Sequence, residues 1–364
     1  MLRFDEKTNL SPMIDLGVSY RPEDIVYFDI ETTGFSPLNT QLYLIGLICY
    51  EEGAYHIRQF FADTKEAEAN VLKEFLSFLS DKKCLVHFNG SGFDLPYIIK
   101  RCRLLHIPCD LGHVESVDLY KLIFPLKSVL KVENLKQKTL EAYLGLDRED
   151  QYNGGELIRV YQDYLETQDE KARDLLLLHN HDDVLGMMAI LPLLHYTGLL
   201  NGEYHVISAS VEEHTNIYGS IQKELLLELA LDRFLPKRIS CGNEHFYCVA
   251  AANTARLCIQ VYEGELKYFY PNYKDYYYLP AEDRALHKSV ASFVDKEFRI
   301  KARASNCYSK KNGIFLPEYE EIISPSFKEE YDSPISYFEF TEAMLKDFSA
   351  LRDYVKHVLK VILR

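Results

Sequence analysis

Tryptophan is absent from this chain of 364 residues, and cationic residues are fewer than acidic ones. The 41 lysines and arginines stand against 55 aspartates and glutamates, which gives a net charge of −14 at pH 7. Such a surplus of negative charge disfavours a protein that coats nucleic acid with its whole surface. It still permits a local basic patch, and carboxylates that surround metal ions would contribute to it.

Signals for membrane insertion, secretion and disulfide formation are also missing. No apolar run approaches the ~18 residues that a membrane helix needs, and the first residues lack the apolar core of a secretion signal. The eight cysteines include no CxxC pair, and several lie in strand-like apolar runs, as buried free thiols do. We therefore expect a cytoplasmic protein that does not contact a membrane.

The length and composition are those of a globular protein with more than one domain. A single core rarely grows past ~250–300 residues, so two domains are expected. We predict an irregular lead-in at 1–22, an α/β domain at 23–200 with a mixed sheet flanked by helices, and a smaller α+β domain at 201–364. The boundary is suggested by YTGLLNGEY (196–204), which brings two glycines after a long helix.

The order of the expected elements determines this fold class. Strands are predicted at 25–31, 41–50, 54–61 and 84–88, and helices at 65–80, from about 94, and at 117–124, 133–143, 155–166 and 170–195. In the second domain, helices are predicted at 215–235, 281–304 and 341–364, and antiparallel strands at 245–251, 255–264 and 265–271. Thr341 is expected to cap the last helix.

Three of these elements carry acidic residues that could act together: the strand at 25–31, the helix that begins near 94 and the helix at 170–195. Asp29 and Glu31 end a strand two residues apart, so the strand period places both carboxylates on one face. Asp94, in NGSGFD, heads a helix, where an N-cap role is the alternative interpretation. In HNHDDVLGM, His179 and Asp183 are four residues apart and share a helix face, whereas Asp182 points about 100° away from Asp183.

Four carboxylates and a histidine from separate elements fit one kind of chemistry. Two divalent ions about 3.5–4 Å apart require hard oxygen ligands, and carboxylates favour Mg²⁺ or Mn²⁺ over zinc. One ion would activate a water and the other would stabilise the leaving oxygen of a phosphodiester. His179 is the candidate catalytic group, because a histidine can orient or deprotonate that water near neutral pH.

Three motifs in these segments resemble those of a known family. The runs FDIETTG, N-x-x-x-F-D (Asn89 to Asp94) and H-x-x-x-D-V (His179 to Val184) are similar to the motifs of the DEDD 3′–5′ exonucleases, which have an RNase H-like fold. The likeness is greatest to the YprB-like group of bacterial RNase H-like exonucleases and covers about residues 23–195. It implies that the metal ligands are Asp29, Glu31, Asp94 and Asp183, and that the substrate contacts include Thr32, Gly34, Asn89 and Phe93.

The third motif departs from the pattern of that superfamily. Its members usually have a tyrosine four residues before the last aspartate, or a histidine five residues before it. This chain has His179 at the four-residue spacing, and Leu178 occupies the other position. The departure leaves open whether His179 reaches the attacking water or is a polar residue at the rim.

The resulting hypothesis is a 3′–5′ exonuclease that hydrolyses single-stranded RNA or DNA by a two-metal mechanism. One alternative is a noncatalytic clamp of the same fold, which would bind nucleic acid without metal. Another is a nucleotide phosphodiesterase or phosphatase, which would act on free nucleotides and gain nothing from longer chains. The sequence does not distinguish RNA from DNA, because no motif specifies contacts to the 2′-hydroxyl.

A basic segment in the second domain suggests how a strand could be guided. KEFRIKARASNCYSKK (296–311) contains six cations and one acid. Lys301 and Arg303 would neutralise phosphates and Tyr308 would stack on a base, although the segment could also be the solvated face of a helix. A zinc site at Cys241, His245 and Cys248 is disfavoured, because CxxxHxxC is not a usual zinc spacing.

Overall fold

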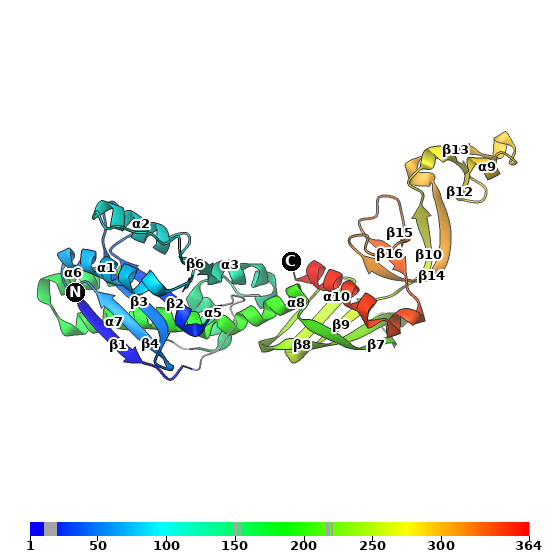
Figure 1. Cartoon of the computed structure of the whole chain (residues 1–364). Helices are drawn as coiled ribbons and strands as arrows, with labels where there is room; N and C mark the ends of the chain where they lie inside the picture. The colour runs from blue at the N-terminus through cyan, green and yellow to red at the C-terminus, as the bar shows by residue number, and fades with distance from the viewer. Residues whose placement is uncertain are drawn as a thin grey trace. The chain divides into compact units, whose positions relative to one another are not determined.

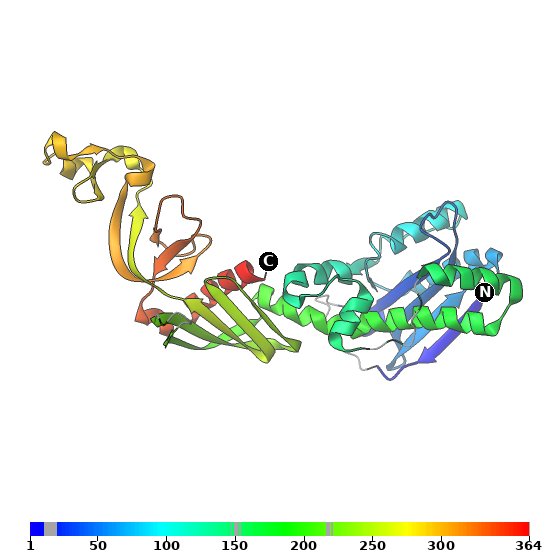
Figure 2. The same cartoon turned by 180° about the vertical axis from the view of Figure 1, so that it is seen from behind.

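The computed structural model describes residues 1–10, 20–146, 148, 152, 154–215, 219 and 221–363. The chain divides into two compact units, Met1–His195 and Tyr196–Arg364, and Figures 1 and 2 show it from opposite sides. Each unit has its own sheets and its own hydrophobic core.

A six-stranded mixed sheet forms the centre of the first unit. Its strands are β1 (Leu2–Lys7), β2 (Ile25–Thr32), β3 (Leu42–Glu51), β4 (Ala54–Phe61), β5 (Cys84–His87) and β6 (Glu115–Asp118). They lie in the order β1-β4-β3-β2-β5-β6. β2, β5 and β6 are parallel, whereas β1 to β4 pair in antiparallel fashion. β2 is thus an inner strand, and its carboxyl end carries the first acidic motif.

The edge strand β1 lies where the sequence suggests an irregular lead-in. Leu2 and Phe4 pack against the main hydrophobic core, while Arg3 between them is exposed. The strand pairs along its whole length with β4, from Leu2 opposite Phe61 to Lys7 opposite His56. Alternation in so short a segment is a weak signal by itself, and the pairing with β4 makes it a strand.

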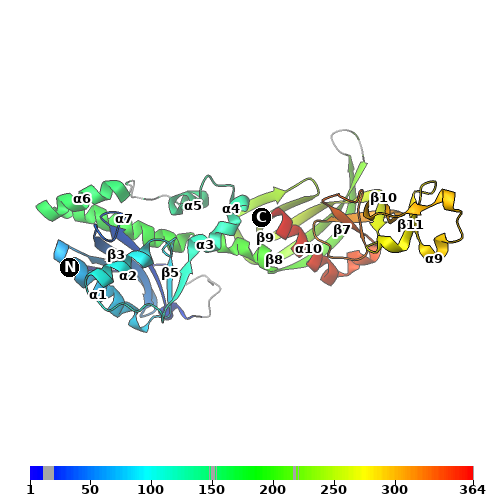
Figure 3. The same cartoon turned by 90° about the horizontal axis from the view of Figure 1, so that it is seen from above.

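Helices cover both faces of this sheet, which confirms the expected α/β class. The helices of the unit are α1 (Glu68–Phe78), α2 (Asp94–Leu104), α3 (Leu119–Ile123), α4 (Lys127–Leu130), α5 (Gln137–Leu144), α6 (Gly154–Thr167) and α7 (Glu170–Ala189). Figure 3 shows α6 and α7 on one side of the sheet and α1 and α2 on the other. Because both faces are covered, β3 is buried over nearly its whole length instead of alternating.

The long helix α7 is the element that brings the third motif to the sheet. It packs against β2 and β3, and its buried face includes Val184 and Met187. By length and composition alone, the helical stretch Glu170–Asn201 could cross a membrane. The segment HNHDD interrupts its apolar run in the sequence, and 61% of its most apolar window is buried inside the protein. A core helix of a globular domain has the same properties.

The second unit is mainly β-structure. One sheet contains β7 (Tyr204–Thr215), β8 (Ile221–Gly242) and β9 (Phe246–Gln260), with α10 (Phe348–Ile362) packed on it. A second sheet has the order β10 (Tyr262–Phe269), β14 (Tyr308–Glu318), β16 (Ser336–Glu339) and β15 (Ser326–Phe327). A third, small sheet contains β12 (Arg284–His287), β11 (Tyr276–Leu279) and β13 (Ile300–Lys301). The short helices α8 (Thr197–Asn201) and α9 (Lys288–Ala291) complete the unit.

The predictions of two helices in this unit are wrong. The segment 215–235 belongs mostly to the strand β8, in which Leu225, Leu227 and Leu229 are fully buried at a spacing of two residues. Leucine, glutamate and alanine favour helices locally, but pairing with β7 and β9 on both sides outweighs that preference. The segment 281–304 forms β12, α9, a 3-10 turn and β13 instead of one helix.

The closing helix is present but begins later than expected. Thr341 precedes a 3-10 turn, Glu342–Lys346, and its side chain makes no capping bond there. The carboxylate of Asp347 caps α10 by accepting a hydrogen bond from the backbone N–H of Ala350. The buried face of α10 includes Leu351, Val355 and Val358, as the sequence pattern predicts.

Candidate active site

The carboxyl end of β2 places two acidic side chains on the face of the sheet that α7 covers. Asp29 and Glu31 are separated by Ile30, which is buried on the opposite face. The Glu31 side chain is 12% exposed and Asp29 is also partly buried, so neither carboxylate is fully exposed at the outer surface of the unit. The strand period thus produces the shared face that the sequence predicts.

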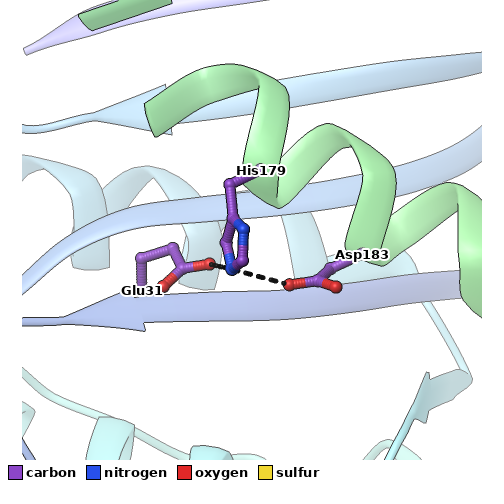
Figure 4. Close-up of side chains that lie close together, drawn as sticks. All are labelled: Glu31, His179 and Asp183. Atoms are coloured by element: carbon purple, nitrogen blue, oxygen red, sulfur yellow. Dashed lines mark ion pairs between the residues drawn. The ribbon is translucent and has the colours of Figure 1, made fainter. Parts of the chain in front are cut away.

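The helix α7 brings His179 and Asp183 to the same place. His179 Nε2 lies 3.5 Å from Glu31 Oε1 and 3.3 Å from Asp183 Oδ2 (Figure 4). One ligand atom from each of these three side chains lies within 4.8 Å of the others. Residues four apart on a helix point the same way, so the contact of His179 with Asp183 follows from the sequence spacing.

Asp94 joins this cluster from the first turn of α2. The residue before it, Phe93, occupies the N-cap position, so Asp94 is not the cap that was its alternative interpretation. Burial raises the pKa of Asp94 to about 7, and the carboxylates of Asp118 and Asp183 contribute to that shift. Burial also raises the pKa of Asp29 well above its usual value, helped by Asp183, Glu31 and Asp94.

These shifts show that four carboxylates share one electrostatic environment. Like charges at such short range oppose ionisation, so bound cations would stabilise the ionised group. Hard oxygen donors from β2, α2 and α7 fit Mg²⁺ or Mn²⁺. The residues that would hold such ions are Asp29, Glu31, Asp94 and Asp183, and His179 faces them through Nε2.

Asn180 supports Asp29, although the sequence analysis did not select it. Its side chain is fully buried, and its Nδ2 donates to Asp29 Oδ2 at 3.3 Å. Gln59 of β4 donates in turn to Asn180 Oδ1 at 3.0 Å and to the carbonyl of Leu177 at 2.8 Å. Gly46 of β3 leaves the space for this amide, because a Cβ there would lie 1.9 Å from Asn180 Oδ1.

Replacing Asn180 with alanine is expected to lower Mn²⁺ affinity and any metal-dependent activity by about 10–100-fold, the usual cost of losing a partner that orients a metal ligand. Calorimetric titration with Mn²⁺ measures the affinity directly. Asn201→Ala, at an exposed asparagine of α8, is the matched control and should leave the titration unchanged. Equal affinities for Asn180→Ala and the parent protein would contradict the role assigned to Asn180.

The turn that carries Asp94 is fixed by a buried acid that was also missed. Asp118, at the end of β6, accepts backbone N–H bonds from Asn89 at 2.9 Å and from Ser91 at 3.4 Å. Asn89 adopts a left-handed φ of 61°, and its side chain lies at the surface. By accepting from the backbone N–H groups of Asn89 and Ser91, Asp118 orients the NGSG turn and, through the turn, Asp94.

A guanidinium group occupies one side of the cluster. Arg148 Nη1 forms an ion pair with Asp183 Oδ1, the oxygen that does not face His179. The same guanidinium binds Glu141 of α5 through Nε and Nη2, the latter at 2.7 Å from Oε1. Arg148 thus supplies positive charge to the carboxylates.

Neighbouring residues of the fold determine the position of Glu141. Its side chain is 3% exposed, and Gln137 Nε2 donates to it at 3.0 Å. A Cβ on Gly186 of α7 would lie 1.9 Å from Glu141 Oε1, so this glycine allows α5 to bring the carboxylate against α7. Because a buried carboxylate needs a partner, Glu141 holds Arg148 beside Asp183.

Arg148 and a metal ion would compete for the carboxylate of Asp183, so removing the guanidinium is expected to change both stability and metal affinity. Arg148→Ala alone should destabilise the metal-free protein by about 3–5 kcal/mol, because Glu141 would be left as an unpaired buried charge. The double variant Glu141→Gln/Arg148→Ala avoids that charge. It should bind Mn²⁺ about tenfold more tightly, since one positive charge beside the ligands has gone. Weaker binding by the double variant would show that Arg148 holds Asp183 in place for metal.

The residues around the first motif offer a surface beside the cluster. Gly34 has a φ of 151°, and a Cβ there would lie 2.9 Å from Thr40 Cγ2, so glycine is required. The hydroxyl of Thr32 donates to the carbonyl of Gly34 at 3.0 Å. Phe35 follows and is 90% exposed, with its ring 6.1 Å from that of Phe93, edge to face. The exposed ring of Phe35 is a feature that the sequence analysis missed.

The remaining residues of HNHDD point away from the cluster. His181 Nε2 lies 3.6 Å from Glu6 of β1, and its Nδ1 lies 3.6 Å from Asp182. Neither belongs to the group of potential ligands formed by Glu31, His179 and Asp183 within the described residues. Of the two adjacent aspartates, Asp183 is the one that faces the other acids.

The substrate contacts expected in the second unit fall in different environments. Lys301 and Arg303 are exposed. Tyr308 is only 6% exposed, and its hydroxyl donates to Asp283, so its ring is not available for stacking on a base. The expectation for Tyr308 is wrong because the residue begins β14, where Phe269 of β10 lies directly opposite it.

Comparisons with known proteins agree with the architecture. Residues 26–194, just under half of the chain, match the model of a family described as the RNase_H superfamily. No curated protein sequence matches. A family B DNA polymerase from the archaeon Pyrobaculum calidifontis is 22% identical, with a TM-score of 0.38, over 49% of this chain and 25% of the polymerase. The metal-free complex of Escherichia coli exonuclease I with single-stranded DNA is 11% identical, with a TM-score of 0.33, over 57% of this chain and 53% of that enzyme.

The family match confirms the RNase H-like fold that the sequence resemblance implies. The chain spans about half the length of exonuclease I and a quarter of the polymerase. These two likenesses are distant, at 22% and 11% identity.

Proposed function

We propose that the RNase H-like domain of this protein is a metal-dependent nuclease, a 3′–5′ exonuclease that acts on single-stranded nucleic acid. One observation supports it above the others: Glu31, His179 and Asp183 converge within 4.8 Å, beside Asp29 and Asp94. We also propose that the chain is a DEDD exonuclease of the YprB-like group. The proposal includes a reducing cytoplasmic location and the absence of membrane contact, which the eight free cysteines and the burial of α7 support.

In this proposal, Mg²⁺ or Mn²⁺ would supply the Lewis acidity that activates a water and stabilises the leaving oxygen of the phosphodiester. The chain's own residues hold the reacting groups. Asn180 fixes the orientation of Asp29, and Asp118 fixes the turn that presents Asp94. His179 faces the cluster through Nε2, the atom that would hold or accept the proton of the attacking water.

The surface beside the cluster suits the end of a strand. The exposed ring of Phe35 offers a flat apolar face to a terminal base, and Phe93 supports its edge. Phe35→Ala is expected to raise KM for an oligonucleotide by about 5–150-fold, the value of one stacked base, with little effect on kcat. Leu38→Ala is the matched control, because Leu38 is 60% exposed in the same loop. A fall in kcat without a change in KM would contradict a stacking role.

The proposal is tested with 5′-labelled single-stranded RNA and DNA, incubated with Mg²⁺, Mn²⁺ or EDTA. A ladder that shortens from the 3′ end and disappears in EDTA would support the exonuclease and identify the sugar. Internal fragments from a circular strand would replace it with an endonuclease. Hydrolysis of free nucleotides with no gain from longer chains would favour a phosphodiesterase. Binding that persists in EDTA without cleavage under any condition would favour a noncatalytic clamp.

A further inference from the structure

A small sheet at the end of the β10–β14 hairpin carries an unusual surface. β11, β12 and β13 form this sheet, which lies beyond the β10–β14 pair in both Figure 1 and Figure 2. The segment 288–303, called the tip segment here, contains α9 and β13. Four of its large apolar side chains are exposed: Val290 by 55%, Phe293 by 91%, Phe298 by 55% and Ile300 by 50%. Single exposed apolar residues are ordinary, but four within sixteen positions make up an apolar patch of the kind that marks binding surfaces.

The fold of this sheet does not use those side chains. Its buried cluster consists of Ala285, Ala302 and Cys307, surrounded by partly buried tyrosines. Those tyrosines are Tyr270, Tyr273, Tyr276 and Tyr278, and they fill the inside of the small sheet. The phenylalanines of the tip segment, Phe293 and Phe298, are exposed to solvent and are not part of this core.

Cations alternate with the exposed rings. The tip segment has five cations and two acids in a chain whose net charge is −14. Within residues 221–363, all of which the structure describes, Lys288, Lys296, Lys301 and Arg303 are exposed and form no ion pair. By contrast, Lys310 and Lys311 on β14 are paired with acids. The positive charge of the patch is thus available to an anionic ligand.

One platform within the patch is defined by strand register. Lys301 of β13 lies directly opposite Tyr277 of β11, so both side chains share one face of the sheet. The guanidinium of Arg299, two residues earlier on the same face, lies 4.8 Å from the centre of the Tyr277 ring. A ring covered by a planar cation, with a lysine beside it, combines base stacking with phosphate neutralisation.

We propose that the tip segment binds single-stranded nucleic acid, with Phe293 and Phe298 stacking on bases and Lys296, Lys301 and Arg303 neutralising phosphates. Flat rings interleaved with unpaired cations are the combination that binds unpaired strands without reading their sequence. A site of this kind would hold a strand whose end is processed elsewhere on the chain. The inference rests on the proposed nuclease function for its choice of ligand, but it can be tested without catalysis.

The test measures binding of fluorescein-labelled dT and rU oligonucleotides to the full chain in EDTA, at several salt concentrations. Phe293→Ala/Phe298→Ala should lower the affinity by at least about tenfold, since two stacked bases are lost. Lys296→Ala/Lys301→Ala should also reduce the slope of log affinity against log salt by about 1.4, since each lost phosphate contact on a single strand removes about 0.7. Because the replaced side chains are exposed, the variants should stay folded, and a melting curve of each variant checks this.

Matched controls come from the closing part of the same unit. Lys346→Ala/Lys356→Ala removes two exposed lysines and should leave both affinity and slope unchanged. Phe348→Ala removes a phenylalanine that is 45% exposed outside the patch and should also have no effect. Equal losses in the control and tip variants would show a nonspecific effect of charge or apolar area and would overturn the proposal.

Other ligands give different results. Unchanged nucleic-acid binding, with tip-dependent sedimentation on vesicles of equal parts phosphatidylcholine and phosphatidylserine, would replace it with membrane binding. Unchanged nucleic-acid binding with a tip-dependent dimer in sedimentation equilibrium would replace it with self-association.

Hydrolysis of a dinucleotide in Mn²⁺ separates this inference from the proposed function, because a dinucleotide can fill the acidic site alone. Tip variants that cleave the dinucleotide normally but bind long strands weakly support both proposals. Tip-dependent binding without any cleavage supports the tip site and contradicts the nuclease. Cleavage with binding that is insensitive to all tip variants contradicts the tip site only.

Discussion

Replacing Asp29 with asparagine will abolish metal-dependent cleavage while the protein stays folded. The loss is expected to reach at least about 1,000-fold, equal to about 4 kcal/mol of transition-state stabilisation. Asparagine keeps the shape of the side chain and can still bond to Asn180, which holds Asp29 at 3.3 Å in the native chain. What it removes is one negative ligand, so titration with Mn²⁺ should show weaker binding in parallel with the loss of rate.

The adjacent aspartates of α7 provide a sharp internal control. Asp183→Asn should behave as Asp29→Asn does, because Asp183 contacts His179 and raises the pKa of both Asp29 and Asp94. Asp182→Asn changes the neighbouring residue, whose side chain faces His181 instead of the acids. Cleavage should therefore survive in Asp182→Asn. Equal losses in the two variants would contradict the geometry assigned to the site.

Stability in the absence of metal will fall as pH rises from about 4 to about 7, opposite to the behaviour of a salt-bridged carboxylate. Burial holds the pKa of Asp94 at about 7, helped by the charges of Asp118 and Asp183, against 3.8 for an ordinary aspartate. Between those two values the folded state binds more protons than the unfolded state, so deprotonation favours unfolding. The cost at pH 8 is on the order of 4 kcal/mol, or about 10 °C in the melting temperature of the first unit.

Divalent metal should reverse this trend, because its ligands must be deprotonated to bind. With Mn²⁺ at about 100 times its dissociation constant, stability should rise by about 2.7 kcal/mol at pH 8 and by much less at pH 5. Differential scanning calorimetry from pH 5 to 8, in EDTA and in Mn²⁺, measures both trends. Asp94→Asn is the control and should make the metal-free curve less steep, because the contribution of Asp94 is removed while that of Asp29 remains. A melting temperature in EDTA that climbs with pH would show that the acids are not crowded as described.

The choice between RNA and DNA depends on contacts that the two sites make with the sugar. Phe35 and the tip segment both offer rings and cations, which bind either kind of strand. Preference would have to come from donors and acceptors placed at the 2′-hydroxyl. The labelled-strand assay therefore decides this question before any structural assignment of the sugar contact.

The sequence by itself determined the acidic residues and their faces. Asp29 and Glu31 share a face because strands repeat every two residues, and His179 and Asp183 share one because helices repeat every 3.6. The alternation of buried and mixed strands with amphipathic helices was also sufficient for the α/β class. These features depend on local periodicity, which any single sequence displays.

Only the tertiary structure decided which residues support those acids. Asn180, Gln59 and Gly46 come from three different elements. Arg148 binds Asp183 directly, and it is held there by Glu141, for which Gly186 of α7 leaves space. The second unit shows the same limit, since β8 has a helix-favouring composition and is a strand because β7 and β9 pair with it. Contacts between segments far apart in the sequence determine these side-chain partners and this strand, and local propensity does not indicate which distant segments will be neighbours.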